Sequence, residues 1–182
     1  SAIARRLQDF SPIVEISPDS PGVFWSSAAG LSLLYPTLHD WARAVRAGLG
    51  EIGFQANVVV GFSRFGTYTL ARTLSGIRVV ESAVEEEQAM RAVPLDRLNF
   101  EPSLLATLDK LGVRTVGTFL RLPAAGLLER FGVGLHQVAE HAVLPAARGA
   151  VEHQHAGCGP VRRRFLRDQL FGKLVVECGE VH

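Results

Sequence analysis

The stretch LLATLDKLGVRTVGTFLRLP, residues 104–123, decides how this chain is interpreted. Leucines recur at helical spacing as far as Leu111, and Gly112 then closes a first helix. Thr115 opens a second helix, which Pro123 stops. This order of helix, glycine turn and helix predicts a helix-hairpin-helix.

The turn of a helix-hairpin-helix exposes backbone N–H groups at the start of its second helix. These donors and the helix dipole bind a DNA phosphate without reading the base sequence. We therefore expect a sequence-independent DNA contact here, to which Arg121 would add positive charge. The alternative is a plain helical hairpin, in which Gly112 serves only as a C-cap. The expected contact residues in the turn are Gly112, Val113, Arg114, Thr115, Val116 and Gly117.

Short helices continue beyond this stretch, over residues 124–131 and 134–143, so that residues 93–146 form an all-helical region. Residues 147–160 are rich in Gly, Ala and His and are typical of a linker. A basic run, Arg162-Arg163-Arg164, follows, and the tail through Glu177 alternates like one or two strands without partners.

Strands and helices alternate on the N-terminal side, over residues 1–92. Two strands around the turn of residues 17–22 predict a hairpin, and a third buried strand is expected over residues 57–61. One helix is expected to open at Thr37 or Pro36 and to end at Gly50 or Gly53. A second helix is expected over residues 67–74, and a short strand over residues 77–80. This order favours an α+β fold, an antiparallel sheet with helices packed on one face.

Composition limits the classes of function. The 182 residues are 47% hydrophobic, which is enough for a core, and no apolar run approaches the length of a membrane helix. The N-terminus shows no signal-peptide core, and two cysteines fit a reducing compartment, so we expect a cytoplasmic protein. The net charge is +1, yet 17 arginines stand against two lysines, a bias that phosphate binding or GC-rich coding DNA explains.

The whole chain resembles the Y-family (UmuC/DinB-like) translesion DNA polymerases, most of all their ImuB-like members. The segments LQDFSPIVEISPD (7–19), NVVVGFSRFGTYTLAR (57–72) and PLDRLNFEPSLLATLDKLGVRTVGTFLRLP (94–123) carry the resemblance, followed by RRRFLRDQL (162–170). It implies an incomplete polymerase palm over residues 1–92, a helix-hairpin-helix thumb over 93–146, and a linker with the beginning of a little finger over 147–182.

The resemblance also exposes a departure. Active members hold two metal ions with carboxylates, because two-metal phosphoryl transfer requires oxygen ligands on both ions. Ser20 and Pro21 stand where an Asp-Glu pair is expected, Asp19 is one place away, and Glu15 is an isolated acid. We therefore expect no catalytic residues and no cofactor. The implied role is that of a non-catalytic, ImuB-like adaptor in mutagenic DNA repair and the SOS response.

Partners follow from the same resemblance. DNA is the expected ligand, with Arg162, Arg163 and Arg164 adding affinity, and Arg72 matches a basic residue that faces the incoming triphosphate in the family. Arg72 would contact phosphate or cap its own helix. The resemblance also implies a sliding clamp and a replicative-type error-prone polymerase as protein partners. It implies association with the nucleoid and no binding to a membrane.

Two other functions stay open. Residues that precede Ser1 and an acid such as Glu15 or Asp19 would complete an active Mg²⁺-dependent polymerase, or the chain is a protein-interaction scaffold without DNA affinity. Three further features are better explained by ordinary structure than by a binding site. A clamp-like peptide, Gln169-Leu170-Phe171, is expected to be a strand. Zinc-compatible residues with loose spacing are expected to bind no metal, and they are His153, His155, Cys158, Cys178 and His182. The acidic run Glu85-Glu86-Glu87 is expected to be a solvated helix start.

Overall fold

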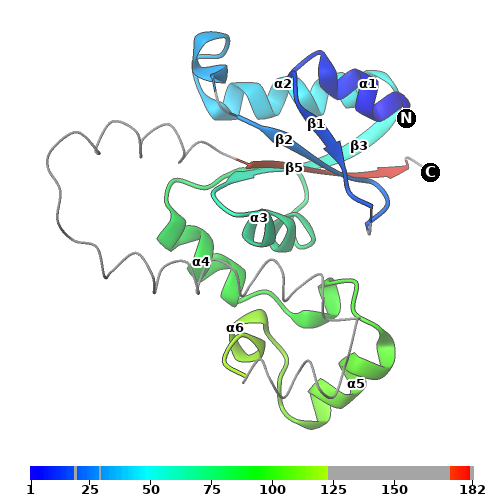
Figure 1. The fold of residues 1–182 in the computed structure, drawn as a ribbon, viewed down its shortest axis with the longest axis vertical. Coiled ribbons are helices and arrows are strands. Elements are labelled where there is room, and N and C mark those ends of the chain that lie inside the picture. Colours follow the sequence, from blue (N-terminus) through cyan, green and yellow to red (C-terminus); the bar gives the residue numbers. More distant parts are fainter. Residues whose placement is uncertain (19, 29, 123–172, 181–182) are drawn as a thin grey trace, which may run out of the picture.

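The computed structural model describes residues 1–18, 20–28, 30–122 and 173–180. It contains one five-stranded sheet in the order β1-β2-β5-β3-β4, with helices on both faces and a helical part beyond one of them (Figure 1). This mixture is compatible with the predicted α+β class. The elements are α1 (Ala2–Gln8), β1 (Val14–Ile16), β2 (Val23–Ser27), the 3-10 helix η1 (Leu31–Leu33), α2 (Leu38–Glu51), β3 (Phe54–Gly61), α3 (Arg64–Ala71), β4 (Ile77–Val79), α4 (Ala83–Arg91), the 3-10 helix η2 (Leu95–Arg97), α5 (Pro102–Lys110), α6 (Val116–Phe119) and β5 (Lys173–Glu180).

The predicted hairpin of β1 and β2 is confirmed. The strands pair antiparallel, with Glu15 opposite Trp25. Ser17 N–H donates to the Val23 carbonyl at 2.9 Å, and Gly22 takes the positive φ of 83° that the turn requires. The turn sequence therefore sets the register, and it places Glu15 and Trp25 on the same face of the sheet.

One face of the sheet packs against α1 and α2. Thr37 caps α2 by accepting a hydrogen bond from Asp40 N–H at 3.0 Å, as its position before the apolar stripe predicts. The stripe of α2 lies against alternate residues of β2 and β3, and Val176 of β5 is buried with them. We call this group the α2 cluster: Leu7, Phe24, Ala28, Leu31, Trp41, Ala42, Val45, Leu49, Ala56, Val58, Val60 and Val176.

The opposite face packs against α3, and α4 packs on α3, so the prediction of helices on one face is wrong. Val58 and Val60 of β3 point into the α2 cluster, whereas Val59 points to the other side, because successive side chains of a strand alternate. The second group continues through η2, α5 and α6 without a break, and we call it the α3 cluster: Val23, Trp25, Val59, Phe65, Leu70, Ala71, Val80, Met90, Val93, Leu95, Leu98, Phe100, Leu104, Leu108, Val113, Val116 and Phe119.

The tail strand, predicted to have no partner, forms the centre of the sheet as β5. It pairs antiparallel with β2 over five positions and with β3 over eight. β3 and β4 run parallel, so the sheet is mixed and not purely antiparallel. Residues 173–180 therefore lie in the same sheet as the palm-like strands, whereas the sequence assigned them to the start of a separate little finger.

Helix boundaries differ from expectation where a cap was overlooked. α3 begins at Arg64, three residues before the predicted start, because the Ser63 hydroxyl accepts from Gly66 N–H at 3.0 Å. α1 had no prediction at all. The expected helices over 124–131 and 134–143 lie outside the described residues, and the division of the chain at residue 92 stays a prediction.

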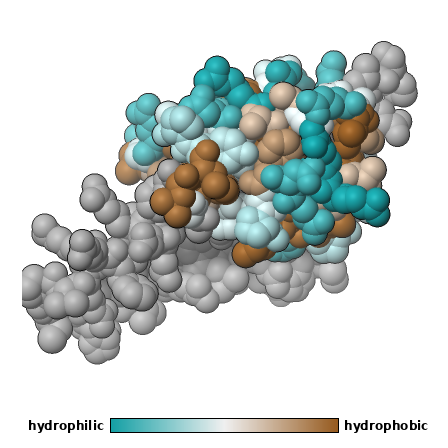
Figure 2. Space-filling view, turned by 90° about the horizontal axis from the view of Figure 1, so that it is seen from above, coloured by the Kyte–Doolittle hydropathy of each residue, from teal (hydrophilic) through white to brown (hydrophobic). Residues whose placement is uncertain are grey.

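The surface over α1 and α2 is largely hydrophilic, with compact hydrophobic patches between the polar groups (Figure 2). Leu33 and Leu34, in and after η1, are 89% and 75% exposed. In the described part of the chain, no helix combines the length and the apolar character that crossing a membrane would require.

Candidate nucleic-acid interface

The segment predicted to be a helix-hairpin-helix contains α5, the turn after it and α6. Gly112 has a φ of +74°, its N–H donates to the Asp109 carbonyl, and Val113 N–H donates to the Leu108 carbonyl, both at 2.9 Å. These two bonds constitute a Schellman motif, with the usual apolar contact because Val113 and Leu108 are both buried in the α3 cluster. Gly112 thus ends α5 as the sequence predicts.

The second helix begins with a capping box. Thr115 Oγ1 accepts from Thr118 N–H at 3.3 Å, and Thr115 N–H donates to Thr118 Oγ1 at 3.1 Å. Val116 N–H donates to the Val93 carbonyl at 2.9 Å, which fastens the turn to the segment before η2. Leu95 N–H donates to the Arg114 carbonyl, also at 2.9 Å, so a second backbone hydrogen bond joins the same two segments.

These bonds reduce the number of amides that a phosphate could reach. In the turn as described, the N–H groups of residues 112, 113, 115, 116 and 118 all donate within the protein. The N–H groups of Arg114 and Gly117 have no acceptor among the described residues; Gly117 is buried, whereas the Arg114 side chain is 73% exposed. The expectation of a row of exposed amides is therefore narrowed to the backbone and side chain of Arg114.

Gly117 has a packing role instead. A Cβ on Gly117 would lie 2.9 Å from the Arg91 carbonyl oxygen and 3.0 Å from Arg91 Cβ, so glycine permits α6 to approach the end of α4. Val113, Val116 and Gly117 are buried, Thr115 is half-buried, and Gly112 and Arg114 are exposed. Among the six turn residues, Gly112 and Arg114 are thus the ones that present themselves to a ligand.

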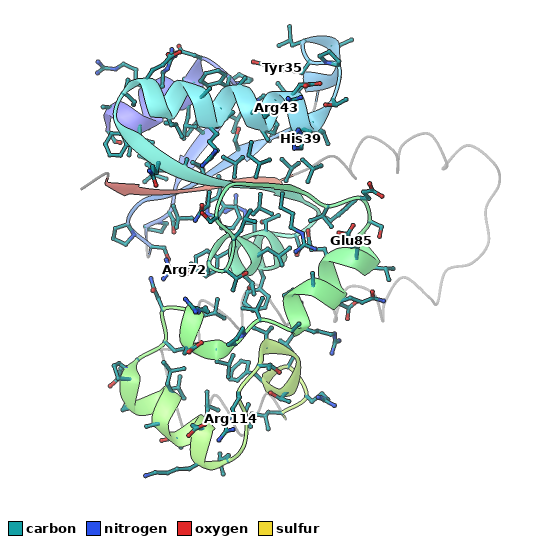
Figure 3. All side chains as sticks on the ribbon, turned by 180° about the vertical axis from the view of Figure 1, so that it is seen from behind. Tyr35, His39, Arg43, Arg72, Glu85 and Arg114 are labelled. Carbon is teal, nitrogen blue, oxygen red and sulfur yellow. The ribbon has the colours of Figure 1, made fainter. Side chains whose placement is uncertain are left out.

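Arg114 does not stand alone. Its Nε donates to Asp109 Oδ1 at 2.7 Å, across the turn from the end of α5. The two terminal nitrogens of the guanidinium have no partner in the described part of the chain. Arg121 is exposed, and its Nε donates to the Gly117 carbonyl at 3.2 Å. Figure 3 shows Arg114 at the end of the molecule opposite α2, distant from Arg43 and His39.

Arg72 links the sheet side of the molecule to the helical side. Its Nε donates to the Arg97 carbonyl and its Nη2 to Asn99 Oδ1, both at 3.0 Å. Figure 3 shows Arg72 at this boundary, between α3 and the chain that leads to α5. These two hydrogen bonds give Arg72 a structural role that joins α3 to η2 and the segment after it, which differs from the predicted cap on its own helix. Arg162, Arg163 and Arg164 lie outside the described residues.

Glu15, the acid considered as a metal ligand in the polymerase alternative, lies on the sheet face that α3 covers. Both carboxylate oxygens of Glu15 accept from Arg64, at 2.6 Å from Nη1 to Oε1 and by a second bond from Nη2 to Oε2. The hydrogen bond to Glu15 raises the pKa of Arg64, and its guanidinium also lies over the Trp25 ring, 5.3 Å from the centroid. Ser20 is buried in the turn before β2.

Glu86 is a buried acid in the first turn of α4, so the predicted helix start is confirmed, whereas the expectation that Glu86 is solvated is wrong. Its side chain lies at the beginning of α3, where it accepts from the N–H groups of Phe62 and Ser63 at 2.5 and 2.9 Å and from Ser63 Oγ at 2.5 Å. A Cβ at Gly61 or Gly66 would collide with its carboxyl group. The glycines that flank Ser63 were the available signal, since they mark a close approach.

Metal ligands are not gathered in the described part of the chain, where no three His, Cys, Asp or Glu residues lie close enough to hold an ion. Of the zinc-compatible residues, Cys178 lies on β5, and His153, His155, Cys158 and His182 lie outside the described residues. Residues 169–171, the clamp-like peptide, lie outside them too.

A sequence comparison relates this chain to a known DNA polymerase. The chain is 31% identical over 144 residues to a DNA polymerase IV of Moorella thermoacetica, a match that covers 75% of this chain and 35% of that protein. The chain therefore spans about a third of the length of this relative. The match supports a relationship to the Y-family DNA polymerases, and it does not distinguish an ImuB-like subtype. No family model matches the chain, and no solved structure matches it.

Proposed function

We propose that this chain is a Y-family polymerase-like DNA-binding protein that acts in translesion synthesis and DNA repair. The similarity to a DNA polymerase IV over 144 residues is the observation that carries this proposal. The helix-hairpin-helix geometry adds a means of contact, because it presents Arg114 at an exposed turn. The ligand would be the phosphate backbone, which is the same in every DNA sequence.

In this proposal, Arg114 is the main phosphate ligand of the turn. Asp109 binds Nε and leaves the two terminal nitrogens, which together with the Arg114 amide would donate to one phosphate group. Arg121 would add charge from the following turn of chain. Arg162, Arg163 and Arg164 would extend the contact, as would Arg72 if its present acceptors are exchanged for phosphate.

The finer part of the proposal is that the protein binds DNA without polymerising it, as an ImuB-like adaptor. Ser20 and Pro21 stand in place of an acidic pair, and neither supplies a carboxylate oxygen. Glu15 already uses both oxygens on Arg64, so binding Mg²⁺ there would require the protein to give up that ion pair. A sliding clamp and an error-prone polymerase would be its protein partners.

Fluorescence anisotropy of a labelled primer-template across a salt series tests DNA binding. The unmodified chain should bind unrelated sequences equally, with an affinity that falls steeply as salt rises. Arg114→Ala should weaken binding about tenfold and reduce the salt slope by about one phosphate contact. Arg5→Ala removes an exposed arginine from α1, far from the turn, and serves as the matched control.

Binding that is equal in Arg114→Ala and Arg5→Ala would contradict the assignment of the turn. Binding that favours one sequence would contradict a backbone contact. Gly117 is unsuitable as a probe of phosphate binding, because any side chain there displaces α6 from Arg91. Metal-dependent primer extension by this chain would contradict the non-catalytic part alone.

A further inference from the structure

The centre of the sheet comes from the far end of the chain. β5 stands between β2 and β3, and in the described residues it is the element that joins the β1-β2 pair to the β3-β4 pair. Residues 120–172 separate it from α6, which precedes it among the described elements. β2 and β3 thus form the two walls of a slot that receives one extended strand, antiparallel to both.

We propose that this slot is an interaction site for a second copy of the chain, which fills it with its own residues 173–180. Two copies that exchange β5 reciprocally form a closed two-fold dimer, in which each sheet contains four strands from one copy and β5 from the other. The ligand of the slot is therefore an extended peptide segment held by backbone hydrogen bonds on both sides.

The fraction of chains that exchange β5 depends on the protein concentration. Every backbone hydrogen bond and the burial of Val176 are the same whether β5 comes from its own chain or from its partner. What differs is the entropy of joining the ends, which grows only slowly with the number of intervening residues. The effective concentration of a chain's own β5 is on the order of millimolar or below, so refolding at high protein concentration should favour exchange.

The register supplies a direct test. Ala56 of β3 lies opposite Cys178 of β5, and opposed residues on antiparallel strands are close enough for a disulfide. Ala56→Cys, made together with Cys158→Ser, should therefore form a disulfide with the native Cys178. The variant is refolded from denaturant over a range of concentrations, oxidised, and separated on a non-reducing gel.

We expect a cross-linked monomer after refolding at low concentration and a growing fraction of disulfide-linked dimer as the concentration approaches the millimolar range. Gln55→Cys with Cys158→Ser is the matched control. Gln55 lies opposite Gly179 and is one residue away from Ala56 on β3, so a cysteine at position 55 is out of register with Cys178 and should cross-link far less.

Three results would overturn the proposal. They are a cross-linked monomer at every concentration, no disulfide in the Ala56→Cys chain, and equal dimer in the Gln55→Cys control. Because Ala56 is buried, sedimentation of the unmodified chain after the same refolding gives an independent reading. A dimer fraction that rises with refolding concentration supports exchange, and a monomer throughout contradicts it.

Discussion

Glu86 is the residue on which the start of α3 depends. It reaches from α4 to accept three hydrogen bonds from Phe62 and Ser63, and it is 3% exposed. It satisfies backbone donors that a helix start otherwise leaves to water, and its negative charge lies at the favourable end of the helix dipole. Glu86 thereby joins α4 to α3 through the N–H groups at the start of α3, which are groups of the kind that bind anions at other helix starts.

Replacing this carboxylate should destabilise the fold. Glu86→Gln keeps the size but exchanges one acceptor oxygen for a donor, so at least one buried N–H loses its partner, at a cost of about 1–3 kcal/mol in the free energy of unfolding. The urea midpoint measures this change. Glu87→Gln is the control, because Glu87 forms an exposed pair with Arg91 that contributes about 1 kcal/mol or less. Equal midpoints in the two variants would refute the role of Glu86.

Thr69 offers a change in the opposite direction. The side chain is fully buried on α3, and its Oγ1 has no hydrogen-bond partner in the described part of the chain. Thr69→Val has nearly the same shape and removes an unsatisfied hydroxyl, so it should raise the free energy of unfolding by about 1 kcal/mol. Thermal unfolding measures the shift.

Thr67 provides the comparison for Thr69 within the same helix. It is also fully buried, but its Oγ1 is shared between the carbonyls of Ser63 and Arg64, at 2.7 and 3.1 Å. Thr67→Val should therefore lower the melting temperature while Thr69→Val raises it. Two shifts of the same sign would show that hydroxyl satisfaction does not decide the outcome.

At the scale of the element, the first turn of α2 is sensitive to acid. The Thr37 hydroxyl donates to Asp40 at 2.6 Å and Arg43 donates to it at 2.5 Å, and these contacts lower the pKa of Asp40 below its ordinary value of 3.8. A lowered pKa in the folded state stabilises the protein above the ordinary value, and this contribution is lost as pH falls through the folded value.

Asp40→Asn should therefore reduce stability near neutral pH, and its effect should shrink as pH falls below the ordinary value of 3.8 toward the lowered folded-state pKa. Urea midpoints of both chains across this range give the difference. A difference that stays constant with pH would contradict titration of Asp40 as its source. Asp9→Asn, which removes another exposed acid paired with an arginine, controls for general charge effects.

Helix ends were predictable because their chemistry is local. Thr37, Gly112 and Thr115 each bond backbone groups only a few residues away, so the neighbouring sequence is enough to predict each cap. Glu86 was misjudged because its partners are 23 and 24 positions away, and an acid at a helix start is ordinarily solvated. The exposure of the turn amides was overestimated because most of them donate to the local caps and because Val116 N–H donates to the Val93 carbonyl of another segment.

At the scale of the whole molecule, the hydrophobic pattern predicted the strands but not their order. Three consecutive apolar residues, Val58, Val59 and Val60, contact two different clusters. Such a run is typical of a strand that is covered by helices on both faces, and this signal was overlooked in the prediction. The place of β5 depends on pairing between residues more than a hundred positions apart, such as Val58 with Val176. No local signal specifies such a contact.

The central place of β5 also orders events during synthesis. β2 and β3 emerge from the ribosome well before residues 173–180, and at about 5–20 residues per second the interval from β4 to β5 is roughly 5–20 seconds. During that time β2 and β3 each have one unpaired edge inside the future sheet. We therefore expect the nascent chain to expose both strand edges during this interval, so that its yield in cells depends on translation speed as well as on its final stability.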